Sequence, residues 1–288
     1  MKTCVCFITH SFSPELRRRF ETLRRQAPAG AEVRILAQKG SGIPDELLPI
    51  TSFFEFARLR ERAVRVIGDR LVPGNVHLAF LHFRDAEPGF DEYWFIEYDV
   101  VFNGDWRTLF DETAGDRADL IASEIRAESD APGWYWWPTL DFPGRAPGPL
   151  VRAFFPLCRI SGRALDVVAR RVKDRWSGHQ EGLITTALID EGLAVSDIGG
   201  DGPWTPASRR HRFYVGVSTS DSEMLLGTFR CAPPHFLPPL IPDALYHPVK
   251  ERRVPNMGDL LKMRQRARLL LSPRIAWALL SAYARALF

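Results

Sequence analysis

The 288-residue sequence has few cysteines, no long apolar segment and no evident internal repeat or low-complexity stretch. Its four cysteines are Cys4, Cys6, Cys158 and Cys231. Their positions match neither a zinc site nor a small disulfide scaffold. Cys4 and Cys6 alternate within an apolar strand, and we expect them to be buried thiols, which suits a reducing cytoplasm. No apolar run reaches the roughly 18 residues that a membrane-spanning helix needs, and Met1 leads directly into a strand. The sequence therefore predicts a cytoplasmic protein.

Net charge is also small, only +3, but it is unevenly distributed. Residues 1–72 carry a net +5, residues 73–248 a net −9 and residues 249–288 a net +7. A basic C-terminal tail indicates contact with nucleic acid or with anionic lipid, or a helix face that is merely solvated. We expect no nucleic-acid partner, and we leave a peripheral contact with the inner face of the membrane open.

Apolar strand patterns and amphipathic helix patterns alternate along the chain. The first βαβ unit covers residues 4–9, 14–26 and 33–37, which favours a parallel sheet with right-handed crossovers. Further strands are expected at residues 93–101, 119–123, 151–160 and 193–198. Further helices are expected at residues 53–70, 76–83, 106–110, 161–173, 182–188, 257–271 and 275–284. We predict an α/β, Rossmann-like domain over residues 1–250, with a mostly parallel central sheet flanked by helices, and a helical tail over residues 251–288.

The most informative stretch is residues 93–102, an aromatic and apolar run that contains the two acids Glu97 and Asp99. In an extended chain, side chains two residues apart point to the same face. Burying an unpaired carboxylate costs several kcal/mol, so these acids need a metal ion, an arginine or backbone amides. Two acids at the carboxyl end of a central strand can chelate a divalent ion beside a phosphate group.

The segment Trp94-Phe95-Ile96-Glu97-Tyr98-Asp99-Val100 resembles the acidic motif of GT-A-type glycosyltransferases, in the nucleotide-diphospho-sugar transferase superfamily. In that family a short Asp-x-Asp motif holds a metal ion and the donor diphosphate. Here the first acid is Glu97, as in a bacterial branch with a Glu-x-Asp motif. The resemblance, over roughly residues 3–250, implies a metal-dependent, hexosyltransferase-like enzyme that moves a sugar from a nucleotide-diphosphate donor such as a UDP-sugar to a glycan or other hydroxyl acceptor.

The resemblance also implies a cofactor, Mn²⁺ or Mg²⁺, and its ligands. Asp99 would be the main, catalytically essential ligand, and Glu97 would act through water or bind the ribose. His247, in the sequence Tyr-His-Pro-Val-Lys, would complete the shell, although a lone histidine is usually structural. Mixed oxygen and imidazole ligands suit Mn²⁺ better than Mg²⁺.

Five further residues are candidates for binding the nucleotide-sugar. Thr9 and Ser11 lie in the polar turn after the first strand, where doubly wound folds bind nucleotides. By resemblance, Asn75 and His77 begin a helix at the donor site, and Lys250 meets phosphate. Helix capping explains Thr9 or Asn75 equally well, and His77 can be an ordinary half-buried helix residue.

The acceptor side is expected around residues 134–137 and the start of the helix near residue 181. Trp134 and Trp136 can stack on a sugar, or the aromatic run can plug the core. By resemblance, Glu181 faces the acceptor and is the general base if the enzyme inverts; alternatively it only complements the helix dipole. His179 is a candidate for orienting the acceptor.

Two other functional classes remain. A nucleotidyltransferase usually has a glycine-rich basic loop after the first strand, where this chain has Thr9-His10-Ser11-Phe12-Ser13. A non-catalytic nucleotide-sugar-binding module of the same fold is the third hypothesis. The sequence leaves open the donor, the acceptor, the stereochemistry and the oligomeric state. It also leaves open whether the tail packs on the domain, pairs subunits or contacts lipid.

Overall fold

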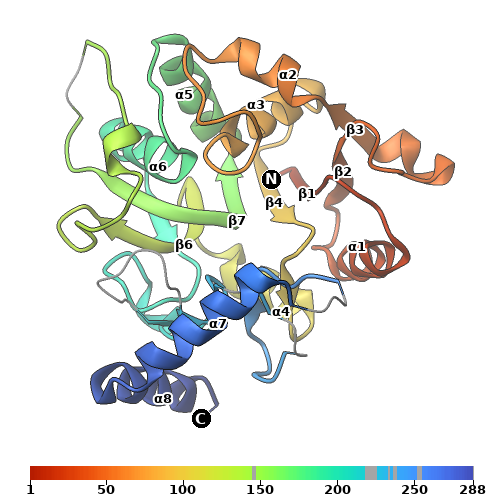
Figure 1. Ribbon diagram of the computed structural model, residues 1–288. Helices are drawn as coiled ribbons and strands as arrows, with labels where there is room; N and C mark the ends of the chain where they lie inside the picture. The colour runs from red at the N-terminus through yellow and green to blue at the C-terminus, as the bar shows by residue number, and fades with distance from the viewer. Residues whose placement is uncertain (145–146, 218–225, 233, 236–238, 252–254, 288) are drawn as a thin grey trace. The chain divides into compact units, whose positions relative to one another are not determined.

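The computed structural model describes residues 1–144, 147–217, 226–232, 234–235, 239–251 and 255–287 (Figure 1). The contacts divide the chain into two compact units. Unit 1 comprises Met1–Tyr98 and Asp116–Ser196, and unit 2 comprises Asp99–Gly115 and Asp197–Phe288. The predicted division into a catalytic domain, 1–250, and a tail, 251–288, stays a prediction, because contacts group the chain without showing which residues act in catalysis.

Unit 1 contains the central seven-stranded sheet, except for the last residue of its final strand, with the order β3-β2-β1-β4-β7-β6-β8. The strands are β1 (Thr3–Thr9), β2 (Glu32–Gln38), β3 (Thr51–Phe54), β4 (Glu92–Glu97), β6 (Leu120–Ala127), β7 (Val151–Ser161) and β8 (Val195–Asp197). Strands β3, β2, β1 and β4 are mutually parallel, while β7 runs antiparallel to β4 and to β6. The predicted α/β class with a mostly parallel central sheet is confirmed.

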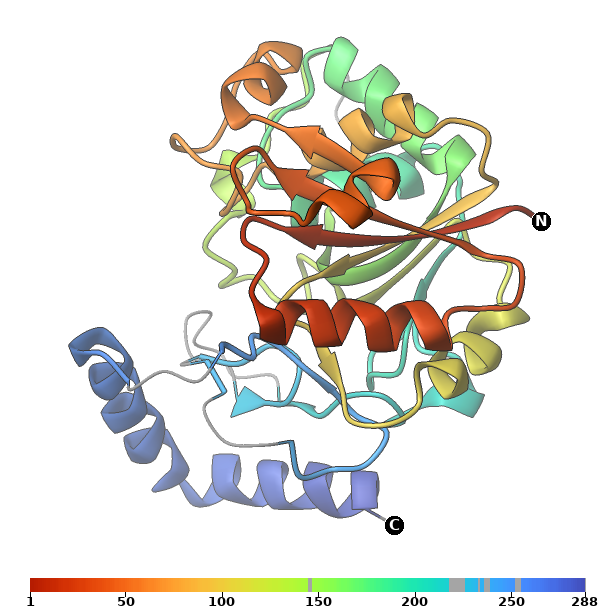
Figure 2. The ribbon, with the colours of Figure 1, turned by 90° about the vertical axis from the view of Figure 1, so that its right-hand side faces the viewer.

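Helices cover both faces of this sheet. They are α1 (Pro14–Gln26), α2 (Phe56–Leu59), α3 (Val76–Ala86), α5 (Gly162–Lys173) and α6 (Gln180–Asp190), with short 3₁₀ turns η1 (Asp45–Ile50), η2 (Arg60–Arg62) and η3 (Trp137–Thr139). Helix α1 lies on one face, and α3, α5 and α6 lie together on the other (Figure 2). Because β1 and β4 are parallel neighbours, their carboxyl ends lie at the same edge of the sheet.

Aromatic side chains anchor β4 and β1 between these helical layers. Phe95 of β4 stacks on Phe80 of α3, with ring centroids 4.1 Å apart. Phe7 of β1 contacts Phe20 of α1 at 5.7 Å. Each fully buried side chain of this size stabilises the fold by about 1.5–3 kcal/mol, which explains why the aromatic run forms the middle of the sheet.

Local sequence signals account for α1 and for the thiols. Ser13 accepts a hydrogen bond from the Leu16 amide at 3.2 Å, and Pro14 occupies the first helical position. Cys4 and Cys6 are fully buried in β1, and burial raises the pKa of Cys4 to about 12. The predicted helix at 14–26 and the predicted buried thiols of β1 are therefore confirmed.

The helix predicted over residues 53–70 is wrong. Residues 51–54 form the edge strand β3, in which Ser52 pairs with Leu36 of β2, and only the short α2 and η2 follow. The sequence Thr-Ser-Phe-Phe has high strand propensity, and pairing with β2 overrides the amphipathic spacing further along.

The strand predicted over residues 93–101 is correct only as far as Glu97. Tyr98 and Asp99 form a turn, and the chain then enters β5 (Val101–Phe102) of unit 2. Strand β5 pairs antiparallel with β11 (Leu245–Tyr246), so the buried apolar residues after the turn belong to another sheet. Glu97 and Asp99 therefore do not share one face of a strand.

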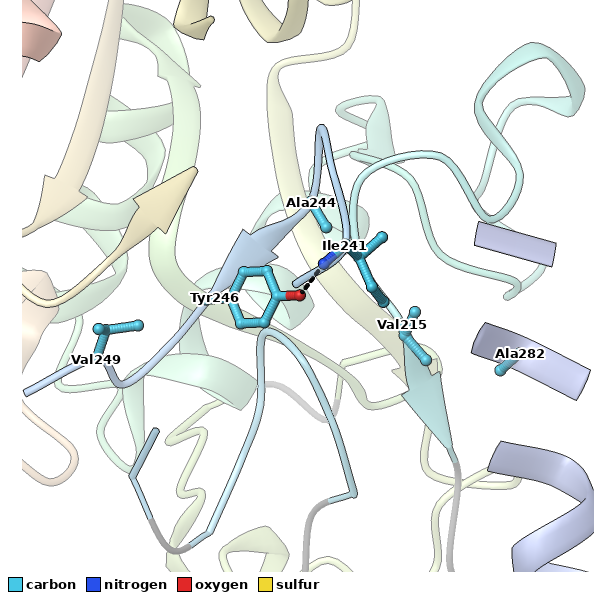
Figure 3. Packing of buried hydrophobic residues seen from close by; sticks show 6 residues of the cluster. All are labelled: Val215, Ile241, Ala244, Tyr246, Val249 and Ala282. Carbon is cyan, nitrogen blue, oxygen red and sulfur yellow. Dashed lines mark hydrogen bonds between the residues drawn. The ribbon is translucent and has the colours of Figure 1, made fainter. Parts of the chain in front are cut away.

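Unit 2 is built from short strands and helices: β5, α4 (Trp106–Ala114), η4 (Ala207–Arg209), β9 (Gly216–Val217), β10 (Leu226–Gly227), β11, α7 (Met257–Leu270) and α8 (Pro273–Leu287). Val215, Tyr246 and Ala282 belong to its buried cluster (Figure 3). The Tyr246 hydroxyl accepts the Ile241 amide at 2.8 Å, which satisfies a buried polar group within this core. The predicted C-terminal helices are confirmed, and no helix among the described residues has the length and apolarity to cross a bilayer.

Candidate functional site

The carboxyl ends of β1 and β4 lie side by side in unit 1. Ile8 pairs with Glu97, the last residue of β4, and the Tyr98 amide donates to the Ile8 carbonyl at 2.9 Å. The Arg19 guanidinium donates to the Tyr98 carbonyl at 3.3 Å. These bonds determine where the chain leaves the sheet and therefore where the acidic segment begins.

The turn after β1 is closed by Thr9 and Ser11. The Thr9 hydroxyl donates to the Ser11 carbonyl, and the Ser11 amide donates back to the Thr9 hydroxyl at 3.3 Å. Thr9 is buried, so its side chain shapes the turn from within, while Ser13 caps α1. A role for Thr9 or Ser11 in binding a nucleotide stays a prediction.

Asp99 is the central acid of unit 2. It is 3% exposed, and its Oδ1 lies 3.5 Å from Nε2 of His247. The Lys250 ammonium forms an ion pair with Oδ2, and the Asp99 carbonyl accepts the Val249 amide at 2.9 Å. Burial alone would raise the pKa of Asp99, but His247 and Lys250 outweigh it and hold the pKa well below its usual value. Asp99 is therefore a carboxylate at physiological pH.

The surroundings of Asp99 fit a divalent cation. A separation of 3.5 Å is too long for a good hydrogen bond, and among the described residues Asp99 Oδ1 accepts none. Ligand atoms on one ion, each roughly 2.0–2.6 Å from it, lie about 3 Å or more from each other. A carboxylate beside an imidazole suits a divalent transition-metal ion better than it suits Mg²⁺, and the choice of Mn²⁺ stays a prediction. Glu97 lies two residues before Asp99, so chain connectivity keeps a second carboxylate near Asp99.

In unit 1, helix α6 begins at a densely packed point. The Gln180 amide donates to the Gly74 carbonyl at 3.2 Å, and the Thr186 hydroxyl exchanges bonds with the Val151 backbone at 3.1 Å. These bonds hold the first two turns of α6, which include the buried Glu181, against the loop before α3 and the start of β7.

Two tryptophans hold the His179 ring. Trp136 stacks on it, with centroids 4.8 Å apart and planes 25° apart, and Trp134 meets it edge-on at 5.5 Å. Nδ1 of His179 accepts the Glu181 amide at 3.4 Å, so a neutral ring carries its proton on Nε2. Unit 1 thus brings the predicted acceptor residues together, while their role stays a prediction.

The four aromatics at residues 134–137 divide into two kinds. Trp134 and Trp137 are buried and pack edge to face at 4.6 Å, whereas Tyr135 is 66% exposed. Trp136 is half-buried. The alternative of a core plug therefore describes Trp134 and Trp137, and Trp136 presents the partly accessible ring.

Asn75 and His77 have different surroundings. The Asn75 amide nitrogen donates to the Ile67 and Arg70 carbonyls at 2.7 Å, and its oxygen accepts the Ile67 amide at 3.0 Å. Asn75 therefore closes the loop before α3. Burial, and then the charge of His179, lower the pKa of His77 to about 3, so the His77 ring is neutral at physiological pH.

Three buried polar atoms near the start of α6 lack a hydrogen-bond partner among the described residues: His77 Nδ1, Trp134 Nε1 and Gln180 Oε1. Leaving such an atom unsatisfied costs about 1–3 kcal/mol, so water or a ligand is expected to bind it. Sequence reasoning missed Gln180, because no sequence pattern marks a glutamine at a helix start as buried. The α6 cluster is defined here as His77, Trp134, Trp136, His179, Gln180 and Glu181.

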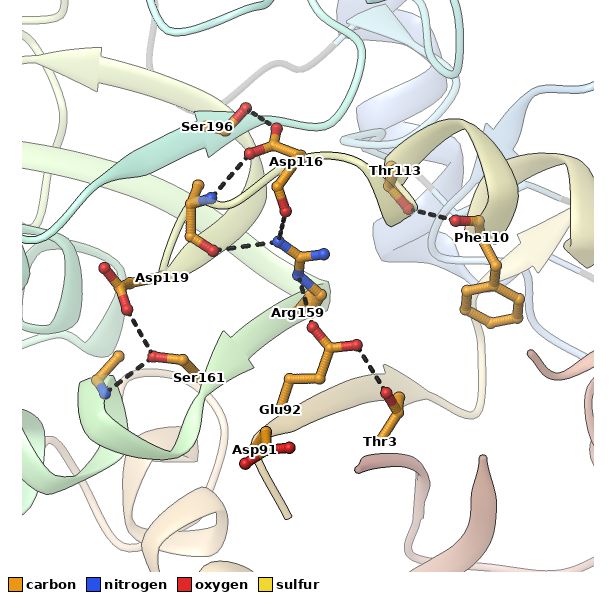
Figure 4. A network of polar contacts seen from close by, with 12 residues as sticks. Thr3, Asp91, Glu92, Phe110, Thr113, Asp116, Asp119, Arg159, Ser161 and Ser196 are labelled. Carbon is orange, nitrogen blue, oxygen red and sulfur yellow. Dashed lines mark hydrogen bonds and ion pairs between the residues drawn. The ribbon is translucent and has the colours of Figure 1, made fainter. Parts of the chain in front are cut away.

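A second buried polar cluster lies where β4 starts and β7 ends, whereas α6 packs at the start of β7. Figure 4 shows this cluster from close by. The Arg159 guanidinium lies 3.4 Å from a Glu92 carboxylate oxygen and donates to the Asp116 carbonyl at 2.5 Å. The other Glu92 oxygen accepts the Thr3 hydroxyl at 2.8 Å. Each of these buried charges therefore has a partner of opposite sign or a backbone group.

The same pairing continues to Asp119, which accepts Arg163 at 2.7 Å and Ser161 at 2.8 Å. The paired cluster is defined here as Thr3, Glu92, Asp116, Asp119, Arg159, Ser161 and Arg163. All of these residues except Thr3 line a cavity of about 470 Å³. On this wall, Arg159 therefore pairs with Glu92, and Arg163 pairs with Asp119.

No family model and no curated protein matches this sequence. The inositol-1-phosphate CTP transferase from T. maritima is 10% identical with a TM-score of 0.40, over 69% of this chain and 86% of that chain. A protein designated a glucose-1-phosphate thymidylyltransferase from Bacillus anthracis, in complex with a sucrose, is 10% identical with a TM-score of 0.39, over 68% and 87%. Apo mouse xyloside xylosyltransferase 1 is 11% identical with a TM-score of 0.38, over 68% and 85%. Similarities this weak establish neither a shared family nor shared site residues.

Proposed function

We propose that this chain is a metal-dependent glycosyltransferase of the GT-A type, which transfers a sugar from a nucleotide-diphosphate donor to a hydroxyl acceptor. The observation that supports the proposal most directly is the buried carboxylate of Asp99, with His247 Nε2 at 3.5 Å and Lys250 as its ion-pair partner. A buried acid surrounded by an imidazole and an ammonium group is arranged to bind a cation and a phosphate together.

In this proposal Asp99 and His247 would hold Mn²⁺, with Glu97 contributing through water or binding the ribose. The ion would supply neutralisation of the charge that develops on the departing diphosphate. Lys250 helps to keep Asp99 ionised. When the donor binds, the Lys250 ammonium group would leave Asp99 and pair with a donor phosphate instead. Thr9 and Ser11 would contribute through the turn that they close, and Asn75 through the loop that it holds.

The acceptor would bind at the α6 cluster. Trp136 offers a partly accessible aromatic face for a sugar ring, and His179, whose Nδ1 accepts the Glu181 amide, would donate from Nε2 to an acceptor oxygen. If the transfer inverts the anomeric centre, Glu181 takes the proton of the attacking hydroxyl. The hydroxyl oxygen then bonds to the anomeric carbon as the bond from that carbon to the diphosphate breaks.

Calorimetry with UDP and MnCl₂ tests the donor site. We expect Asp99→Asn to abolish metal-dependent UDP binding and His247→Gln to weaken it. Asp111→Asn removes an exposed carboxylate on α4 of the same unit and is the matched control. Unchanged UDP affinity in Asp99→Asn would exclude the metal role.

Product analysis distinguishes the competing functions. A glycosyltransferase releases UDP from a UDP-sugar, and hydrolysis of the donor in Mn²⁺ reports this even without the acceptor. A nucleotidyltransferase instead joins a sugar 1-phosphate to a nucleoside triphosphate, and the triphosphate releases pyrophosphate. A binding module binds UDP but does neither.

A further inference from the structure

Helix α8 has an apolar face on each side. On the inner side, Leu279 and Ala282 are each 7% exposed, and Ala282 belongs to the buried cluster of unit 2 (Figure 3). On the outer side, Trp277 is 72% exposed and Leu280 is 65% exposed. The packing of α8 on its own unit therefore accounts for the apolar residues of only one of its two faces.

The exposed apolar residues of α8 form a continuous stripe: Trp277, Leu280, Ala284 and Leu287. Their spacing of three, four and three residues places them on one side of the helix. Helix α7 adds exposed apolar side chains at Met257 and Leu261, and Leu271 follows directly after it. Monomeric proteins rarely leave an array of large apolar side chains in water without a binding purpose.

The exposed charged side chains of α7 and α8 are all positively charged. Five cationic side chains are exposed on the two helices: Lys262, Arg264, Arg268, Arg274 and Arg285. The one acid between residues 255 and 288, Asp259, is buried and caps the start of α7 through reciprocal bonds with Asn256. The exposed charge of α7 and α8 is therefore positive and favours an anionic partner.

We infer that α7 and α8 dock on a membrane surface that contains anionic lipid. Exposed Trp and Leu side chains enter the boundary between headgroups and acyl chains, while arginine and lysine side chains contact lipid phosphates. A symmetric dimer through the same face would instead place the five exposed cations of one copy against those of the other. Repulsion between these like charges disfavours a second copy of the chain as the partner of this face. The inference does not depend on the proposed glycosyl transfer.

Flotation with phosphatidylcholine vesicles, with and without phosphatidylglycerol, tests the inference on the full chain. We expect binding to the phosphatidylglycerol vesicles that weakens as salt is added, and little binding to phosphatidylcholine alone. The double variant Trp277→Glu/Leu280→Glu should lose at least about tenfold in partition coefficient, since two apolar anchors are replaced by anionic side chains. Leu240→Glu, which alters an 82% exposed leucine elsewhere in unit 2, is the matched control.

A second pair of variants tests the charge. Arg264→Gln/Arg268→Gln should lower partition by roughly thirtyfold, the effect of two basic groups near an anionic surface. Arg58→Gln/Arg60→Gln removes two exposed charges from unit 1 and should leave partition unchanged. Equal binding to both vesicle types, or none to either, would overturn the inference. So would a dimer in sedimentation velocity that Trp277→Glu/Leu280→Glu dissociates, because the face would then belong to a second copy.

Discussion

The two ends of the central sheet of unit 1 each contain a buried polar cluster, and the two clusters differ in how their groups are satisfied. In the paired cluster, Arg159 and Glu92 pair with each other and with backbone or hydroxyl groups. In the α6 cluster, His77, Trp134 and Gln180 each contain a buried polar atom without a partner among the described residues. A fully paired cluster stabilises the fold through its own contacts, whereas buried polar atoms without a protein partner are expected to bind water or a ligand.

Within the two clusters, Glu181→Gln is the substitution with the largest expected effect on activity. It should lower sugar transfer by about 10²–10⁴-fold, because a lost general base typically costs that much, and it should leave UDP affinity intact. Transfer from a UDP-sugar, assayed beside the exposed control Glu128→Gln, provides the measurement. Full activity in Glu181→Gln would place the base elsewhere or indicate a retaining mechanism.

Arg159→Met should have the largest effect on stability. It leaves Glu92 buried without its cation, which typically costs about 3–5 kcal/mol, and urea unfolding measures the loss. Arg62→Met breaks the more exposed pair with Asp85 and should cost less than about 1 kcal/mol. If Arg159→Met kept full stability but lost UDP binding, the paired cluster would be functional and the comparison would fail.

Asn75→Ala should destabilise the protein by about 1–3 kcal/mol, since it leaves buried backbone groups of the preceding loop unsatisfied. The unfolding midpoint in urea reports this change. Lost UDP affinity with unchanged stability would instead assign Asn75 directly to the donor.

His77→Phe should change stability least at pH 7, within about 1 kcal/mol, because it removes a polar ring whose Nδ1 has no partner among the described residues. The effect of His77→Phe on the free energy of unfolding depends on pH. Between pH 6.5 and about 3 the unfolded state binds a proton at His77 that the folded state does not, so the wild type loses stability as pH falls through this range.

The slope of the unfolding free energy against pH measures this effect. His77 contributes at most about 1.4 kcal/mol per pH unit, and His77→Phe should show a correspondingly shallower loss of stability on acidification. Identical slopes in the two proteins would mean that His77 is not held neutral by its surroundings.

Local patterns predicted much of the fold correctly. The Ser13-Pro14 start and the spacing of Leu16 and Phe20 predicted α1, because capping and helical periodicity act over a few residues. The continuous apolarity of residues 93–96 predicted an interior strand, since a strand buried on both faces has no polar alternation. The same reasoning failed at residues 51–54 and beyond Glu97, where pairing with distant strands determined the outcome.

The sequence by itself determined the class of the protein, its buried thiols, the aromatic strand β4 and the residue types available for chemistry. Only the tertiary structure decided that Asp99 lies against His247 and Lys250, roughly half the chain away, and that Trp134 is buried while Trp136 stacks on His179. Periodicity and capping reflect contacts between residues that are near in the chain. The partners of a buried charge or ring depend on long-range packing, which no local pattern encodes.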